Sequence, residues 1–228
     1  MSENSILTFP LAEAKATGFY SANDAARLGR VPIHRLYAWR REGIIVPTVV
    51  ATDATGKQVT GYTFHALTYL RVLRMLRDKR LPLFKTVDAV KHLRDRFGPP
   101  GPAWEDARIF IQDGDVFADS RDQWEVTVST RKGQRVATLL MGDEFARLRD
   151  RADALLIPDK FQLFVEIDPA ARSGLPIIRG TTIQTATPYG LRHRQMSLAR
   201  IRESYPHLTL EQIKAAIQFE RFLDAEAA

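Results

Sequence analysis

The spacing of apolar side chains in the first hundred residues predicts helices interrupted by one hairpin. Ile33, Leu36 and Trp39 recur every third residue and form a single stripe, which is typical of a helix with one buried face. A shorter helix, with Ser21 as its capping residue, is expected before the turn at Gly29. Together the two segments predict a helix-turn-helix.

Two extended runs and two longer helices follow in the pattern. Residues 44–50 and 58–64 flank a loop that contains Gly56 and are predicted to pair as a β-hairpin. A leucine at every third position then predicts a long helix, with the leucines at 67, 70, 73 and 76. Pro82 ends this helix, and residues 83–97 are predicted to form the next one.

The middle of the chain changes to a β pattern after the proline- and glycine-rich residues 98–102, which mark a domain boundary. Asp113 and Gly114 predict a hairpin turn between two short strands. Further strands are expected at 124–129 and 135–140, followed by a helix over 143–154. Because a few short strands bury little apolar surface, this segment is expected to pack on a neighbouring domain or a second subunit.

The last part of the chain returns to helices after two short strands. Residues 163–167 and 176–180 are expected to pair, and the helices are expected at about 187–194, 197–204 and 209–226. Ser197 can cap the second helix, and Thr209 with Gln212 has the spacing of a capping box. The fold class predicted for the chain is therefore mainly α with small β elements (α+β).

Composition changes the picture by what it excludes. The chain has no cysteine, no apolar run of about 18 residues and no secretory leader in its first five residues, so we expect a cytoplasmic protein without membrane contact. The five histidines lack metal-ligand spacing. Turn chemistry accounts for the acidic residues near Gly114. We therefore expect no enzyme, no metal and no cofactor. The acidic residues are Asp113, Asp115, Asp119 and Asp122.

Charge is divided unevenly between the two parts of the chain. Residues 1–100 hold 16 Lys and Arg against 8 Asp and Glu, a net charge of +8, whereas the remaining residues hold 17 against 19, a net charge of −2. A basic first part facing a polyanion is one interpretation, and a solvated basic surface is the other.

The order of elements in residues 18–97 resembles the MerR-type winged helix-turn-helix. The residues that carry this resemblance are Tyr20-Ser21, Ala25-Ala26-Arg27-Leu28, Trp39, Glu42-Gly43-Ile44-Ile45, Pro47 and Gly61-Tyr62. Two cations usual in that family are replaced, by Tyr37 in the second helix and by Thr63 after the wing. The resemblance implies binding to DNA, and Trp39 and Tyr62 are expected in the core.

The basic face of the second helix is the predicted DNA-binding site. Cationic side chains there neutralise phosphates, and arginine can also bind guanine edges. A lysine at the tip of the wing could reach a phosphate in the adjacent groove. The predicted site comprises Arg30, His34, Arg35, Tyr37, Arg40, Arg41 and Lys57.

A second resemblance lies in the last third of the chain. Its residues are Ile167-Asp168-Pro169, then Gly174-Leu175-Pro176-Ile177-Ile178-Arg179-Gly180-Thr181-Thr182-Ile183, and Tyr205-Pro206-His207-Leu208-Thr209. This pattern is similar to a small bacterial family of domains interpreted as antitoxins. The resemblance implies a PIN-like ribonuclease toxin as partner, and thus an antitoxin of the VapB kind in a toxin–antitoxin system.

A basic group in the last domain is the predicted toxin-binding site, because a guanidinium can compete with a metal ion for nuclease carboxylates. It comprises Arg192, His193, Arg194, Arg200 and Arg202. Three alternatives remain open for these residues and this partner. The group could bind DNA, it could be a solvated surface, or the toxin could instead pair with an edge strand of the middle segment.

Taken together, the sequence predicts three domains: residues 1–98 for DNA binding, 99–158 as a β-rich segment that dimerises, and 159–228 as the antitoxin domain. The predicted function is an antitoxin that neutralises a PIN-like ribonuclease and represses its own operon as a homodimer on operator DNA. The alternative is a MerR-like transcriptional regulator without a toxin partner. An enzyme is the least favoured class, since no acid/base constellation emerges.

Overall fold

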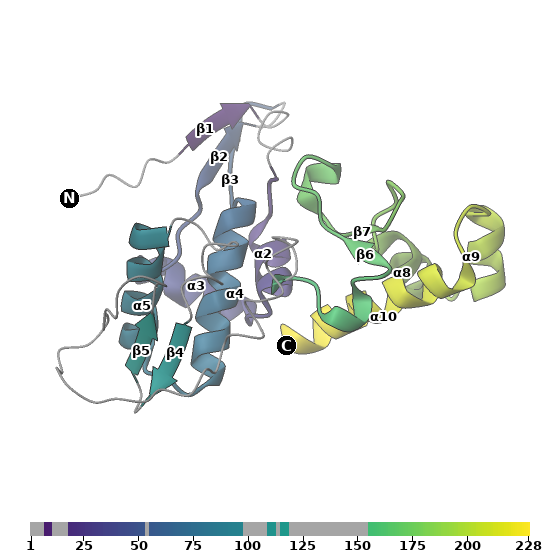
Figure 1. Ribbon diagram of the computed structural model, residues 1–228. Helices are drawn as coiled ribbons and strands as arrows, with labels where there is room; N and C mark the ends of the chain where they lie inside the picture. The colour runs from purple at the N-terminus through teal and green to yellow at the C-terminus, as the bar shows by residue number, and fades with distance from the viewer. Residues whose placement is uncertain (1–6, 11–17, 53–54, 98–108, 113–114, 119–154) are drawn as a thin grey trace. The chain divides into compact units, whose positions relative to one another are not determined.

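The computed structural model of the chain describes residues 7–10, 18–52, 55–97, 109–112, 115–118 and 155–228 (Figure 1). In chain order its strands and α-helices are β1 (Leu7–Pro10), α2 (Ala22–Gly29), α3 (Ile33–Arg41), β2 (Val49–Thr52), β3 (Gln58–Gly61), α4 (Phe64–Asp78), α5 (Leu83–Phe97), β4 (Ile109–Gln112), β5 (Asp115–Ala118), β6 (Val165–Glu166), β7 (Ile177–Ile178), α8 (Ala186–His193), α9 (Leu198–Ser204) and α10 (Leu210–Glu226). The fold is mainly α with small β elements, as the sequence predicts.

The described residues fall into two compact units. One unit is drawn from residues 1–67 and 157–228, and the other from residues 68–156. The first unit therefore contains both the helix-turn-helix and the C-terminal helices. The three-domain division with boundaries at 98 and 158 stays a prediction.

Local sequence signals explain the helix-turn-helix. The Ser21 hydroxyl accepts a hydrogen bond from the Asp24 backbone N–H at 3.2 Å and starts α2. Arg30 ends it with a left-handed backbone, at φ 55°. Pro32 is the N-cap residue of α3 and directly precedes its first helical residue. Gly43 follows α3 at φ 68°, a conformation that glycine adopts without strain.

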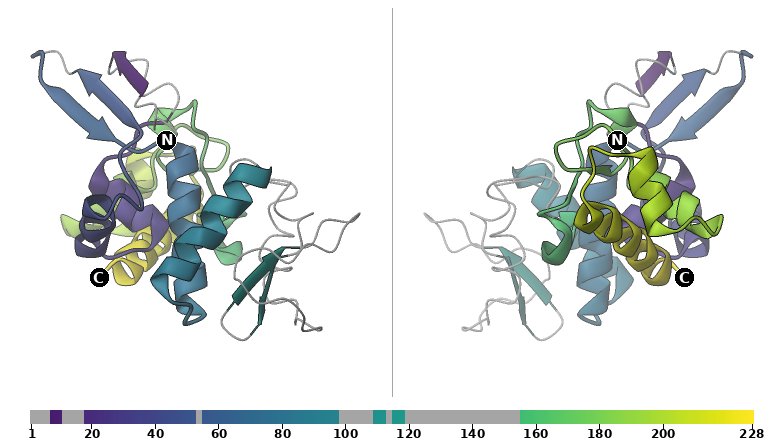
Figure 2. Two further views of the ribbon diagram at one scale, coloured as in Figure 1. Left: turned by 90° about the vertical axis from the view of Figure 1, so that its left-hand side faces the viewer. Right: turned by 90° about the vertical axis from the view of Figure 1, so that its right-hand side faces the viewer.

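The wing is a hairpin within a three-stranded sheet. β2 pairs antiparallel with β3, with Val50 opposite Thr60. The strand β1 pairs parallel with β2 on its other edge, and the apolar pattern did not predict it. Figure 2 shows the three strands side by side. Phe19 and Val59 pack against the buried side chain of Val49.

The C-terminal part of the first unit is a two-stranded sheet followed by three helices. β6 pairs antiparallel with β7, and the helices begin and end within two residues of the predicted positions. Thr209 and Gln212 exchange both hydrogen bonds of the predicted capping box at the start of α10. The core of this part consists of Ile178, Ile201, Leu208, Ile213, Ala216 and Ile217.

The second unit holds most of α4, all of α5 and a strand pair. α4 buries the predicted leucine stripe, and α5 buries Val90 and Leu93. β4 and β5 form the predicted antiparallel pair, and β5 lies against α5. The strands expected at 124–129 and 135–140, the helix expected at 143–154 and the turn at Asp113 and Gly114 lie outside the described residues.

Candidate nucleic-acid interface

One face of α3 carries exposed polar and cationic side chains. Leu36 and Trp39 are buried on one side of the helix. His34, Tyr37 and Arg41 follow at i, i+3 and i+7 on the opposite side, where all three are exposed. One side of α3 is therefore packed in the core and the other side is open to solvent.

Arg35 and Arg40 flank that exposed face. Arg40 is exposed, whereas Arg35 is half-buried. Burial raises the pKa of Tyr62, and the positive charge of Arg40 opposes this rise. Tyr62 is 2% exposed and Trp39 is 3% exposed, which confirms that both aromatic rings belong to the core.

The wing contributes one exposed cation and one capping residue. Lys57 is exposed beside Gly56, whose φ is 82°. Thr63 stands where the MerR-type pattern usually has arginine. Its hydroxyl accepts from the Ala66 backbone N–H at 3.3 Å in the first turn of α4, and it lies 3.3 Å from the Thr48 hydroxyl. In this chain the position stabilises the turn between wing and helix.

Arg30 lies apart from the other predicted contacts. Its side chain is buried, at 8% exposure, and its guanidinium carbon lies 4.9 Å from the centre of the Phe222 ring on α10. A cation over an aromatic face is stabilised by the ring quadrupole. The buried Arg30 guanidinium is thus held against α10 and is not part of the exposed face of α3.

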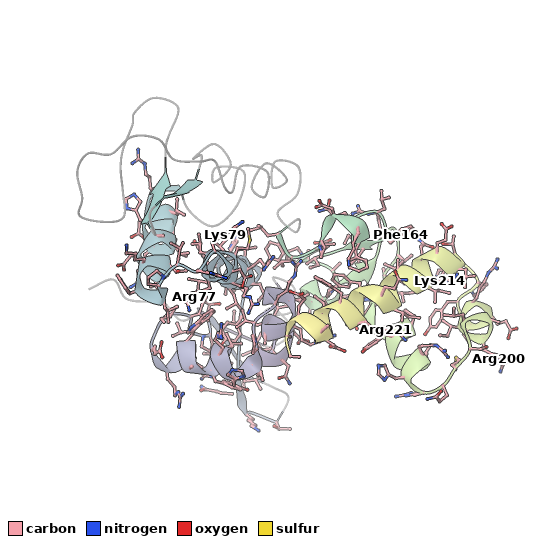
Figure 3. All side chains as sticks on the ribbon, turned by 90° about the horizontal axis from the view of Figure 1, so that it is seen from below. Arg77, Lys79, Phe164, Arg200, Lys214 and Arg221 are labelled. Carbon is pink, nitrogen blue, oxygen red and sulfur yellow. The ribbon has the colours of Figure 1, made fainter. Side chains whose placement is uncertain are left out.

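The cations predicted to bind a toxin all lie at the end of the C-terminal part formed by α8 and α9. Arg192, His193, Arg194, Arg200 and Arg202 are each exposed. Figure 3 shows Arg200 projecting from α9. Arg200 pairs with Glu203 at 3.1 Å, and Arg192 donates to the Met196 carbonyl at 3.2 Å. Arg202 and Glu203 also line a shallow hollow of about 540 Å³ with Leu198, Ala199, Pro206 and Leu210.

The structure also shows a contact that the sequence did not predict, between α2 and α10. Arg27 Nη2 lies 2.7 Å from Glu220 Oε2, and Arg27 Nε donates to Asp224 Oδ1 at 2.8 Å. Burial acts to lower the pKa of Arg27, but its hydrogen bonds and charge interactions with Glu220 and Asp224 together outweigh this, so the pKa is raised. The guanidinium is thus held as a cation.

A second contact joins the start of the helix-turn-helix to the C-terminal motif. Tyr20 donates its hydroxyl proton to the Gly174 carbonyl at 2.7 Å, across 154 residues of sequence. Burial raises the pKa of Tyr20, and the charges of Asp24 and Asp168 add to the rise, so the hydroxyl remains protonated and able to donate. No local sequence signal pointed to either contact.

Within the described ranges, no three side chains from His, Asp and Glu come together as metal ligands would. No helix in the same ranges combines the length and apolar character that a bilayer crossing demands.

Comparison with known proteins assigns two domains to the chain. Residues 20–96 match the family described as MerR HTH family regulatory protein, and residues 165–219 match the family described as protein of unknown function, DUF433. A search of curated proteins found no match. The crystal structure of Rv2018 from Mycobacterium tuberculosis is similar in fold, with 18% identity and a TM-score of 0.55. That match covers 87% of this chain and 96% of Rv2018.

The chain therefore carries a MerR-type helix-turn-helix domain at its N-terminus and a DUF433 domain at its C-terminus. The MerR-type domain indicates a DNA-binding regulator of transcription, a class that is not enzymatic.

Proposed function

We propose that this DNA-binding regulator is an antitoxin of the VapB kind, which neutralises a PIN-like ribonuclease and represses its own operon. One observation carries the proposal: a MerR-type helix-turn-helix and a C-terminal DUF433 domain occur in one chain. The helix-turn-helix supports operator binding. The motif, through its resemblance to antitoxin domains, supports the nuclease as second partner.

The proposed DNA contacts are the exposed face of α3 and the wing. His34, Tyr37 and Arg41 face outward together, with Arg35 and Arg40 at the edges. Guanidinium groups at these places can bind phosphates or guanine edges. Lys57 would reach a phosphate beside them, at the wing.

The proposed nuclease contacts are the cations of α8 and α9. PIN-like nucleases hold their metal ions with clustered carboxylates, so an inserted guanidinium would compete with the metal. Arg192 and Arg194 come from the end of α8, and Arg202 borders the apolar hollow next to Pro206 and Leu210. A cation beside an apolar hollow can pair with a carboxylate of the partner while the hollow receives an apolar side chain.

We expect the chain to be a homodimer, with residues 99–158 as the dimerising segment. One winged domain makes few phosphate contacts, and a two-fold pair matches operators whose half-sites are about 10 bp or a multiple apart. Light scattering at micromolar concentration without DNA should give the mass of two chains. The mass of one chain would contradict the homodimer.

The nuclease proposal is tested by removing two cations from α8. The double variant Arg192→Ala with Arg194→Ala should inhibit RNA cleavage by the co-encoded nuclease about 100-fold less well than the wild type, because truncating a buried charge pair mainly speeds dissociation. The matched control is Lys214→Ala with Arg221→Ala, which removes two exposed cations from α10 (Figure 3).

The control variant should inhibit as the wild type does. Equal loss in both variants would mean that general charge, and not the α8–α9 surface, attracts the nuclease. Unchanged inhibition by the α8 variant would move the contact elsewhere, with the edge strands β4 and β5 as the next candidates. If the full chain binds no co-encoded protein, a regulator without a toxin partner becomes the better account.

A further inference from the structure

The contact between α2 and α10 has a buried carboxylate at its centre. Glu220 is 2% exposed and lies on α10 opposite Arg27 of α2. Its second oxygen accepts the hydroxyl proton of the fully buried Thr185. A buried carboxylate is tolerated only when its charge is paired and its oxygens are hydrogen-bonded, and here each oxygen has a partner.

A second carboxylate extends the same network to the surface. Asp224 lies one helical turn beyond Glu220 on α10 and also accepts from Arg27. Tyr189 of α8 donates its hydroxyl proton to the other Asp224 oxygen at 2.6 Å. Two carboxylates therefore hold the Arg27 guanidinium. Thr185, the N-cap residue of α8, holds Glu220, and Tyr189 of α8 holds Asp224. Such a network holds one geometry and leaves few alternatives.

The second contact, between Tyr20 and Gly174, involves a strained backbone segment. Arg172, Ser173 and Gly174 have φ values of 49°, 61° and 79°, so three consecutive residues are left-handed. L-residues with side chains rarely adopt this conformation, and it persists only where surrounding contacts impose it. The Ser173 carbonyl accepts from the Phe19 backbone N–H at 3.1 Å, and the Gly174 carbonyl accepts from Tyr20. The strained segment thus directs two carbonyls at the start of the helix-turn-helix.

We propose that Tyr20, Arg27, Gly174 and Glu220, which we call the joint, are positioning residues for DNA binding. The joint rests on the proposed DNA-binding function and adds a role for the C-terminal domain in it. By fixing α2, it fixes the direction in which the adjacent α3 presents its exposed face. None of the four residues lies on that face, so the joint acts through α3 and makes no DNA contact.

In a dimer formed through residues 99–158, the C-terminal domain follows the dimerising segment directly in the chain, and the joint fixes the helix-turn-helix to that domain. The joint thus helps to hold the spacing between the two recognition helices. Two rigidly held helix-turn-helix units match one half-site separation. Loosely held units lose the additional affinity that comes from binding both half-sites at once. Weakening the joint should therefore lower affinity for a two-half-site operator and leave affinity for one half-site unchanged. A residue that contacts DNA, or one needed for folding, would lower both.

The experiment compares Glu220→Gln and Tyr20→Phe with the wild type in the full chain. Glu220→Gln keeps the side-chain shape and removes the charge, and Tyr20→Phe keeps the ring and removes the donor. The control is Glu203→Gln, which breaks the exposed pair with Arg200 in the same domain. The probes are the duplex that the wild type selects from a random-sequence pool and the same duplex with one half-site scrambled.

Each joint variant should bind the two-half-site duplex about 10-fold more weakly, with an unchanged salt slope and an unchanged affinity for the single half-site. The Glu203→Gln control should bind both duplexes as the wild type does. Circular dichroism establishes that the variants are folded.

Three results would overturn the joint. The first is wild-type affinity for the two-half-site duplex in both folded variants. The second is an equal loss on both duplexes, and the third is wild-type selection of a single unrepeated site. Failure of the proposed DNA-binding function would be distinguishable, because the wild type would then select no sequence from the pool. That result would also contradict the proposed role of the joint.

Discussion

Replacing Arg35 and Arg40 together by alanine is expected to weaken operator binding on the order of 100-fold at physiological salt, because charge-assisted contacts to phosphate supply much of the affinity. The slope of log affinity against log salt should fall by about 0.9 for each phosphate contact removed. With two cations removed in each of two chains, the total fall is about 3 to 4. A salt titration by fluorescence anisotropy measures both quantities.

The matched control for this experiment is the Arg192→Ala, Arg194→Ala variant, which also removes two cations but from α8. It should bind DNA with the affinity and the salt slope of the wild type. If the α3 variant is unchanged and the α8 variant is weakened, the DNA site lies on Arg192–Arg202 and the assignment to α3 is wrong.

Gly174→Ala is expected to lower the free energy of unfolding by about 3 kcal/mol, combining a left-handed backbone with overpacking. A Cβ on Gly174 would lie 2.1 Å from the Tyr20 hydroxyl oxygen and 2.7 Å from Cζ of the same ring. Either Tyr20 must move away or the strained segment must shift. Both changes break the hydrogen bond between Tyr20 and the Gly174 carbonyl.

Gly180→Ala is the control within the same motif. Gly180 has a similar φ, 74°, but a Cβ there meets nothing within 4 Å. Its replacement should lower the free energy of unfolding by about 1 to 2 kcal/mol, the cost of a left-handed backbone for a residue with a side chain. Urea denaturation of the full chain gives both values. An equal loss of unfolding free energy in the two variants would show that a Cβ at position 174 does not clash with Tyr20. It would contradict the close contact of Tyr20 with Gly174 in the joint.

Helices and caps were the features that the sequence predicted best, because their signals are local. The stripe of Ile33, Leu36 and Trp39, the cap at Ser21 and the capping box of Thr209 each depend on residues within a few positions of one another. The same is true of the hairpin signal for the wing. Such interactions are present in the sequence as spacing, so periodicity is sufficient to find them.

The strand β1 and the α2–α10 contact could not be predicted in this way. β1 ends in proline, which is rare in regular strands, and its pairing with β2 depends on a parallel partner about forty residues away. The pair of Arg27 and Glu220 joins residues 193 positions apart. Nothing in the local pattern distinguishes these two charged residues from the many others on exposed helix faces.

The structure gives two features, Arg30 and the motif around Gly174, contacts within the chain that the sequence did not predict. Arg30 belonged to the basic group by sequence position, but the left-handed backbone that ends α2 directs its side chain to Phe222. The motif around Gly174 pointed to an external partner through its family resemblance. In the structure Gly174 contacts the chain's own Tyr20, so part of the motif is used within the protein. We propose the exposed α8–α9 surface as the contact for the external partner.

The central claim is that one chain binds operator DNA and also silences a nuclease, and RNA cleavage by the nuclease encoded beside it tests this most directly. Purified full-length chain is titrated into that nuclease in the presence of its metal ion and an RNA substrate. The account predicts that cleavage stops as the chain approaches one copy per nuclease. Undiminished cleavage at a tenfold excess of chain that still binds its selected DNA would contradict the claim.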